Sequence, residues 1–107
     1  MPESRPLISV IMAVWNAQRY LGRCLRSMAR QTVTDYEFII VDDGSTDGSR
    51  RFLERWARKD RRIRLITREN RGLTRSLNEA LAAARGDYIA RMDADDISLP
   101  NRFALQI

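Results

Sequence analysis

The chain carries an apolar run, Tyr36-Glu-Phe-Ile-Ile-Val41, that stops at Asp42-Asp43-Gly44 and leads into Ser45-Thr46-Asp47-Gly48. A β-branched run of this length is typical of a strand that is buried on both faces. The small polar residues after it favour the start of a helix. We therefore expect a strand over residues 36–41 that ends in acids, followed directly by a helix.

The same order of elements extends in both directions from this run. Residues 7–14 and 63–67 are apolar stretches of strand length, and residues 88–92 form a fourth candidate strand. Apolar residues at helical spacing predict a helix in each connection; they are Tyr20 or Leu21 with Cys24, Leu25 and Met28, then Phe52, Leu53 and Trp56, and finally Leu73, Leu77 and Leu81. Gly86 suits the left-handed position just after the third helix, and Pro100 suits the first turn of a further one.

Four strands that alternate with three helices predict an α/β fold, with Rossmann-like βαβ alternation and a mostly parallel sheet. In such sheets, ligands bind beyond the carboxyl ends of the strands. Three polar segments are expected at that edge, and they are Trp15-Asn16, Asp42-Asp43-Gly44 and Asp93-Ala94-Asp95.

The composition fits a single globular domain over residues 1–107, since 44% of the residues are hydrophobic and 31% are charged. The chain has no histidine and one cysteine, Cys24, which excludes histidine-based zinc sites and catalytic triads. Its longest apolar stretch falls well short of the roughly twenty residues of a membrane span. The N-terminus lacks a signal-peptide pattern, so we expect a cytoplasmic protein with its cysteine reduced.

The formal net charge is +5, and Lys59 is the only lysine among 19 basic residues. A dense basic patch lies at Arg55, Arg58, Lys59, Arg61, Arg62 and Arg64. It is interpreted either as a solvated helix end or as a contact for an anionic membrane surface or partner. Nucleic acid is not an expected partner, because nucleic-acid binders usually cluster charge with interleaved aromatic residues.

Asp93 and Asp95 are two residues apart after a strand, where a carboxylate with diphosphate oxygens makes a good Mg²⁺ or Mn²⁺ site. The alternative for these acids is a turn and helix cap. The acids after residue 41 fit hydrogen bonds to a nucleobase edge or ribose, with simple helix capping as the alternative. Trp15 is a candidate for base stacking, or else for packing in the core or at its rim. The loop at residues 70–75 brings arginine toward a diphosphate, or else carries solvated arginines at a helix start.

Four motifs, in this order over residues 6–107, resemble the family 2 glycosyltransferases. They are Pro6-Leu-Ile-Ser-Val-Ile-Met-Ala-Val-Trp-Asn-Ala17, Phe38-Ile-Ile-Val-Asp-Asp-Gly-Ser-Thr-Asp47, Glu69-Asn-Arg-Gly-Leu-Thr-Arg-Ser-Leu-Asn78 and Gly86-Asp-Tyr-Ile-Ala-Arg-Met-Asp-Ala-Asp-Asp-Ile-Ser-Leu-Pro100. The resemblance implies the N-terminal, nucleotide-sugar-binding half of a GT-A fold. It also implies transfer of a sugar from a nucleotide-diphosphate donor (UDP-, GDP- or dTDP-linked) to a saccharide or lipid-linked hydroxyl acceptor, with inversion, as in polysaccharide biosynthesis.

The resemblance also implies the roles of individual residues. Asp95 of the DXD motif, with Asp93, would hold Mn²⁺ or Mg²⁺, and Asp93 would approach the ribose or sugar. Trp15 and Asp42 would contact the base. The complete set of implied donor-binding residues is Ala13, Trp15, Asn16, Asp42, Asp43, Asn70, Gly72, Arg75, Asp93 and Ala94.

Two positions depart from the family pattern. The first motif usually reads Pro-x-Tyr-Asn, whereas this chain has Ala13-Val14-Trp15-Asn16, and Arg75 stands where many members have lysine. The catalytic general base is expected beyond Ile107, with the acceptor half, so the chain is expected to be a donor half with an exposed sheet edge suited to self-association.

Two other classes of function compete with this interpretation. The first is a catalytically inactive module that binds a nucleotide sugar or a partner. The second is a receiver-like signalling domain, which requires a lysine at a strand end near the acids, whereas Lys59 falls in a basic region between a helix and a turn.

Overall fold

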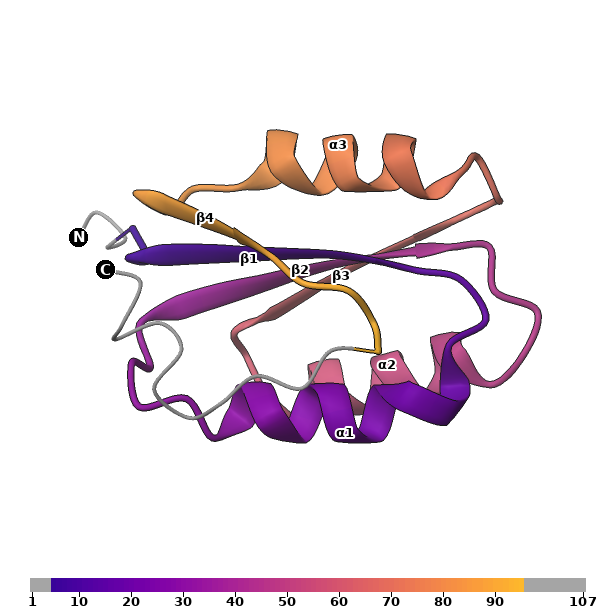
Figure 1. The fold of residues 1–107 in the computed structure, drawn as a ribbon, viewed down its shortest axis with the longest axis horizontal. Coiled ribbons are helices and arrows are strands. Elements are labelled where there is room, and N and C mark those ends of the chain that lie inside the picture. The colour runs from indigo at the N-terminus through magenta and orange to yellow at the C-terminus, as the bar shows by residue number, and fades with distance from the viewer. Residues whose placement is uncertain (1–4, 96–107) are drawn as a thin grey trace.

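The computed structural model describes residues 5–95 and confirms the α/β alternation (Figure 1). The strands are β1 (Ile8–Val14), β2 (Tyr36–Asp43), β3 (Ile63–Arg68) and β4 (Tyr88–Arg91). The helices are α1 (Gln18–Ala29), α2 (Ser49–Lys59) and α3 (Leu73–Ala83). Every strand pair is parallel, and the sheet order is β3-β2-β1-β4.

The strand order determines which face of the sheet each helix covers. The chain moves outward from β1 to β2 to β3 and then returns to the other side of β1 as β4. Because such crossovers are right-handed, the outward and return connections lie on opposite faces. Figure 1 shows α1 and α2 together below the sheet and α3 above it. The described helices include none that is long and apolar enough to cross a membrane.

The two central strands supply most of the core. Every second residue of β1 and β2 packs against α1 and α2. Met12 and Phe38 of the strands and Leu21 of α1 are among the largest side chains that are fully buried there. The opposite residues, including Ile39 and Val41, pack under α3. Because helices cover both faces of the sheet, β1 and β2 are apolar on both sides and their sequences do not alternate between apolar and polar residues.

Strand β2 is longer than the sequence predicts. It continues through Asp42 and Asp43, which pair with Thr67 and Arg68 of β3, while Asp42 also pairs with Val14 of β1. The carboxylates are accommodated in the strand because parallel pairing uses only the backbone. Successive side chains of a strand point to opposite faces, so the two acids lie on different sides of the sheet.

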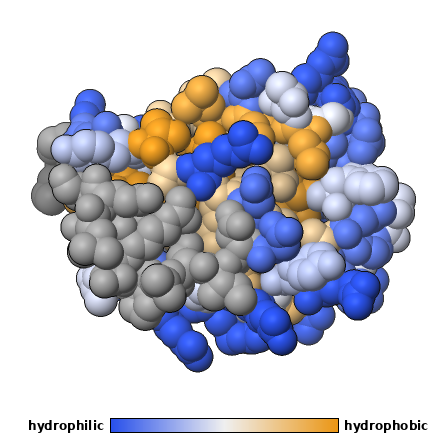
Figure 2. All heavy atoms as spheres, viewed as in Figure 1, coloured by the Kyte–Doolittle hydropathy of each residue, from blue (hydrophilic) through white to orange (hydrophobic). Residues whose placement is uncertain are grey.

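The three leucines of α3, Leu73, Leu77 and Leu81, are less buried than expected from their helical spacing. Ser76 and Ala80 are the buried residues of this helix, whereas Leu73 and Leu81 are each 48% exposed. An apolar groove therefore runs between α3 and β4, lined in part by Ile11. The orange patch beside α3 in Figure 2 shows this face. In the described residues β4 is an edge strand, as the sequence predicts.

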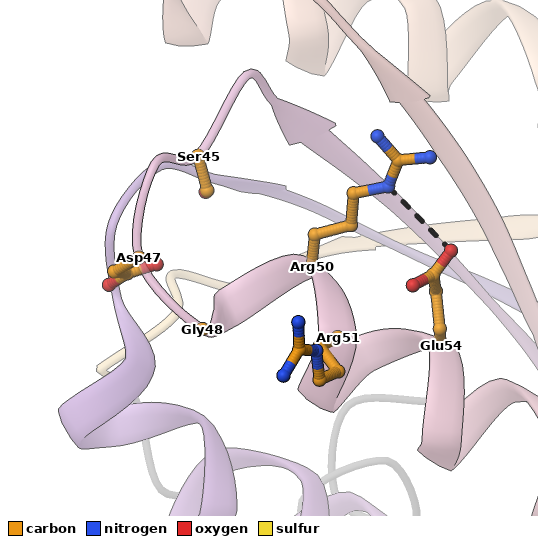
Figure 3. Close-up of a pocket in the computed structure, with 6 residues that line it drawn as sticks. All are labelled: Ser45, Asp47, Gly48, Arg50, Arg51 and Glu54. Carbon is orange, nitrogen blue, oxygen red and sulfur yellow. Dashed lines mark ion pairs between the residues drawn. The ribbon is translucent and has the colours of Figure 1, made fainter.

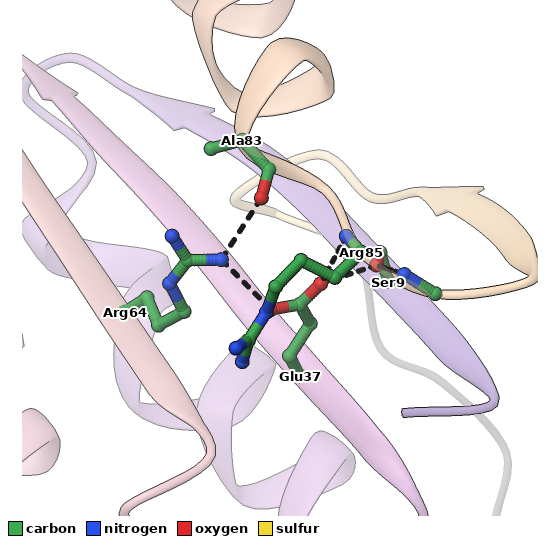
Figure 4. A network of polar contacts seen from close by, with 6 residues as sticks. Ser9, Glu37, Arg64, Ala83 and Arg85 are labelled. Carbon is green, nitrogen blue, oxygen red and sulfur yellow. Dashed lines mark hydrogen bonds and ion pairs between the residues drawn. The ribbon is translucent and has the colours of Figure 1, made fainter. Parts of the chain in front are cut away.

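A buried carboxylate joins four elements at the amino ends of the strands (Figure 4). Glu37 is 4% exposed, and it accepts hydrogen bonds from the Ser9 hydroxyl (2.5 Å), the Arg85 backbone N–H (2.7 Å) and the Arg64 guanidinium (2.9 Å). Burial alone would raise the pKa of Glu37, but these three donors outweigh it and lower the pKa below 4.5. The Glu37 cluster thereby attaches the α3–β4 connection to β1, β2 and β3.

Gly86 belongs to the same cluster, and the expected reason for its being glycine is wrong. Its φ is not positive, so it is not a left-handed helix cap. Instead its N–H donates to the Ser9 hydroxyl at 2.7 Å, and a Cβ at this position would lie 2.6 Å from the Ser9 nitrogen. Glycine is required here because two backbone segments approach closely.

We predict that Glu37→Ala lowers the free energy of unfolding by about 3 kcal/mol at pH 7, because it leaves several donors without an acceptor. Urea denaturation measures the loss, and Glu54→Ala, at a partly exposed position of α2, is the control, expected to cost only about 0.5 kcal/mol. A carboxylate with a lowered pKa stabilises the fold above its ordinary pKa and loses that effect as the pH falls through the lowered value. The advantage of wild type over Glu37→Gln should therefore shrink below pH 4.5, and an advantage that persists in acid would contradict this explanation.

Candidate functional site

The predicted polar segments do meet at one edge of the sheet. The residues that follow β1, the end of β2, the β3–α3 loop and the residues that follow β4 all lie at the carboxyl ends of the strands. The strand order β3-β2-β1-β4 reverses direction between β1 and β4, which makes the end of these two neighbouring strands the topological switch point. Ligands of parallel α/β sheets bind at such a point.

Asn16 joins the loop after β1 to the loop after β2. It has a left-handed backbone with φ 48°, and its N–H donates to the Ser45 hydroxyl at 3.0 Å. Its side-chain carbonyl accepts from the backbone N–H groups of Thr46 (2.8 Å) and Asp47 (3.3 Å). Asn16 was predicted to bind the donor, and the structure shows that its amide also holds two loops of this edge together.

The start of α2 is already occupied by a side chain of the chain itself. Asp47 Oδ1 accepts from the Ser49 N–H at 2.9 Å, and Oδ2 accepts from the Gln18 N–H at 3.3 Å. Figure 3 shows the residues that line a hollow at this helix start, with Asp47 on the loop before α2 and Arg50 directed toward Glu54, with which it pairs at 3.6 Å. Asp47 thus places a carboxylate of the chain itself at the start of this helix.

Asp43 shapes the loop before α3. Its Oδ1 accepts from the Arg71 N–H at 2.8 Å and its Oδ2 from the Gly72 N–H at 3.0 Å, while its carbonyl accepts from the Asn70 side chain at 3.2 Å. Asp43 is 1% exposed, and both of its carboxylate oxygens are used inside the protein. The structure thus brings three of the predicted donor-binding residues, Asp43, Asn70 and Gly72, into contact, and Asp43 has a structural role there.

Asp42 differs from its neighbour in that its side chain has no hydrogen-bond partner among residues 5–95. It is 1% exposed, and its buried Oδ1 accepts no hydrogen bond from the described residues. Leaving a buried acceptor without a donor costs about 1–3 kcal/mol. A position that carries this cost at the ligand edge is suited to a donor group from a bound molecule.

The other predicted donor-binding residues are accessible at the same edge. Trp15 is 49% exposed at the end of β1, where its ring is available for stacking. Arg75 is exposed in the first turns of α3. Ala13 is half-buried within β1, paired with Val41.

The two described acids after β4 lie at a turn, Asp93 just before it and Asp95 within it. Asp93 and Asp95 are exposed, Ala94 packs against the core, and Asp93 lies 3.6 Å from Arg91. No group of three acidic or sulfur ligands occurs among the described residues. This sparse set of carboxylates fits Mg²⁺ or Mn²⁺, because these ions take one or two carboxylates and complete their shell with substrate phosphates and water. Asp96 lies outside the described residues.

Sequence reasoning missed the residues that connect the loops, which are Gln18, Ser45, Asp47 and Ser49. Their hydrogen bonds join residues about thirty positions apart, such as Gly48 to Gln18 at 2.9 Å. The run of Ser, Thr and Asp was interpreted as local helix capping, and the signal that could have found the contacts is the surplus of such side chains beyond what one cap uses.

An all-parallel sheet with acids at its switch point defines an α/β protein of the Rossmann-like, ligand-binding class. The family model for glycosyl transferase family 2 matches residues 9–107, so the chain belongs to that family. The chain is 42% identical over 106 residues to the putative glycosyltransferase EpsE of Bacillus subtilis (strain 168), covering 97% of the chain and 38% of the relative. It is 38% identical over 100 residues to chondroitin synthase of Escherichia coli, covering 94% of the chain and 15% of that enzyme.

Solved structures show the same GT-A fold. The mannosyltransferase PcManGT from Pyrobaculum calidifontis, in complex with GDP-Man and Mn²⁺, matches with a TM-score of 0.81 and 31% identity, over 95% of this chain and 31% of that one. S. aureus TarS 1-349 in complex with UDP-GlcNAc matches with a TM-score of 0.79 and 30% identity, over 92% and 29%. The chain thus spans well under half the length of these proteins.

Two glycines at the carboxyl ends of the strands, Gly44 and Gly72, have a positive φ and differ in the space around them. Comparing them tests how closely the β2–α2 and β3–α3 loops approach each other. Gly44 has φ +73°, and a Cβ there would lie 2.4 Å from the Asn70 nitrogen, whereas Gly72 has φ +98° with open space around it. We predict that Gly44→Ala lowers the free energy of unfolding by about 3 kcal/mol and that Gly72→Ala lowers it by about 1 kcal/mol.

The ¹H–¹⁵N NMR spectrum checks the cause of this difference. Displacement of the β3–α3 loop by Gly44→Ala should move the Arg71 and Gly72 amide signals that report their bonds to Asp43. Equal losses of stability for the two variants, with the Arg71 signal unmoved in Gly44→Ala, would show that contact with Asn70 is unimportant.

Proposed function

We propose that the chain binds the nucleotide-diphosphate sugar donor of a glycosyl transfer at the carboxyl edge of its sheet, together with Mn²⁺ or Mg²⁺. The buried, unpartnered Oδ1 of Asp42 is the observation that carries this proposal. It stands beside the switch point, where the pleat separates it from the structural Asp43. Two structural neighbours named as complexes with GDP-Man and UDP-GlcNAc support a nucleotide-sugar ligand.

Each group at the edge has a distinct task in this proposal. Asp42 accepts a hydrogen bond from an N–H of the base, and Trp15 offers its exposed ring for stacking. Arg75 contributes positive charge toward the diphosphate. Asp95, with Asp93, holds the divalent ion, which when bound neutralises charge on the leaving diphosphate.

We predict metal-dependent binding of UDP or GDP by calorimetry, stronger with Mn²⁺ than in a chelator. Asp95→Ala should remove the dependence on metal, because the ion loses its main protein ligand. Asp42→Ala should weaken binding about ten- to a hundredfold without loss of stability, since Asp42 has no hydrogen-bond partner among the described residues to lose.

Asp43→Ala is the matched comparison for Asp42→Ala. It should lower the free energy of unfolding, since two backbone N–H groups lose their acceptor. Failure of every nucleoside diphosphate to bind, with every divalent metal tried, would refute donor binding at this edge.

We further propose that the 107-residue chain binds the donor without transferring sugar by itself. We propose that the base that deprotonates the acceptor hydroxyl, and with it inversion at the anomeric carbon, is supplied from outside residues 5–95. Chromatography of a radiolabelled donor incubated with acceptor sugars should show no product with the chain alone. Robust turnover by the purified chain would show that the base lies within it, and activity restored by a separately supplied acceptor half would argue against an inactive binding module.

The sheet edge supports a second kind of contact. The apolar groove beside β4 includes Leu77 and Leu81, and β4 is the edge strand of the sheet that residues 5–95 form. We propose self-association through this edge, since apolar grooves and unpaired strands favour pairing with another chain. The cytoplasmic location and the saccharide or lipid-linked nature of the acceptor stay predictions.

A further inference from the structure

The positive charge of the chain is concentrated on two helices. Residues 18–30 contain four basic residues and no acid, and residues 49–59 contain five basic residues and one acid. All other positions together hold ten basic and thirteen acidic residues, so they are net negative. The whole positive excess of the protein therefore belongs to α1, with its C-cap Arg30, and to α2.

These two helices lie in contact on the same face of the sheet (Figure 1). On the α1 side, Arg19, Arg23, Arg26 and Arg30 are exposed. On the α2 side, Arg51, Arg55, Arg58 and Lys59 are exposed in the same way. We call these eight residues the basic face. Figure 2 shows hydrophilic side chains along the corresponding lower border of the molecule.

The charges of the basic face are not neutralised within the described residues. Arg50 of α2 pairs with Glu54, but none of the eight residues has an acidic partner there. The arginines of the sheet and the α3 loop behave differently. Arg64, for example, lies 2.9 Å from Glu37, and Arg68 lies 2.5 Å from Glu79. Internal pairing is thus absent where the positive charge is densest.

Helix stability does not explain this arrangement. Basic residues in the last turn, such as Arg26 and Arg58, are favourable to the helix dipole. Arg19 and Arg51 lie in first turns, where cations are unfavourable, and neither first turn contains an acid. The free protein therefore carries repulsion on this face that an external anionic surface would relieve.

We propose that the basic face docks on the anionic surface of a lipid bilayer. Charges spread over two adjacent helices suit an extended anionic surface, since each basic residue near such a surface adds its own attraction. Tyr20 of α1 is 49% exposed within this face, and a tyrosine has the apolar ring and polar tip that favour the bilayer interface. Nucleic acid fits less well, because the face is built without a set of exposed aromatic rings between the charges.

Docking in this way would place the donor edge beside the membrane. Both α1 and α2 begin at the carboxyl edge of the sheet, next to the loops that contain Asn16 and Asp47. This consequence rests on the proposed function, and it favours an acceptor that is linked to a lipid. The docking itself depends only on the charges of the two helices.

Vesicle co-sedimentation of the 107-residue chain tests the proposal. The chain should bind vesicles of phosphatidylcholine mixed with phosphatidylglycerol, release them as salt is raised, and not bind pure phosphatidylcholine. The double variant Arg26→Gln/Arg55→Gln should bind the anionic vesicles about 25-fold more weakly, at about fivefold for each arginine. Circular dichroism establishes that the variant is folded.

A control variant removes the same net charge elsewhere. Arg5→Gln/Ala82→Glu changes two exposed positions outside the basic face, one before β1 and one on α3, and should bind the vesicles like wild type. Equal weakening by both variants, no binding to anionic vesicles at low salt, or tighter binding to duplex DNA than to vesicles would each overturn the proposal. UDP or GDP titration of the same variants separates this outcome from donor binding, which both variants should retain.

Discussion

The two central strands are buried on both faces, and the remaining architecture depends on that constraint. β1 and β2 expose almost no side-chain surface, so helices must cover each side of the sheet. With right-handed crossovers, this is achieved when the chain moves outward through β2 and β3 and then returns to β4. The return creates the switch point between β1 and β4. The position of the candidate site is thus a consequence of how the core is covered.

The pleat of β2 directs its last two side chains, Asp42 and Asp43, to opposite faces of the sheet, and only one of them is left available to a ligand. Asp42 and Asp43 are adjacent, equally buried and chemically identical, yet they point to opposite faces. Asp43 meets the backbone of the β3–α3 loop and is saturated by it, whereas Asp42 meets no donor from the described residues. One carboxylate therefore shapes the site, and the other is available to a ligand.

The amino ends of the strands, opposite the candidate site, hold β4 in place. The Glu37 cluster binds the connection at Arg85 and Gly86, which precedes β4 by a few residues. Within the described part of the chain, β4 is a short edge strand, with four paired residues next to β1. A short edge strand has few contacts of its own, so this cluster and the backbone bond from Met92 to Ile11 determine where the acids after β4 emerge.

The sequence by itself determined the order of strands and helices, the parallel sheet and the edge at which the acids gather. It could do so because apolar runs, helical spacing and strand ends are local patterns, and the four motifs also placed the chain in its family. Only the tertiary structure decided that β2 includes Asp42 and Asp43, that Asn16 and Asp47 join two loops, and that α3 leaves Leu73 and Leu81 exposed. Those features arise from hydrogen bonds and packing between segments distant along the chain, whose partners no local pattern specifies.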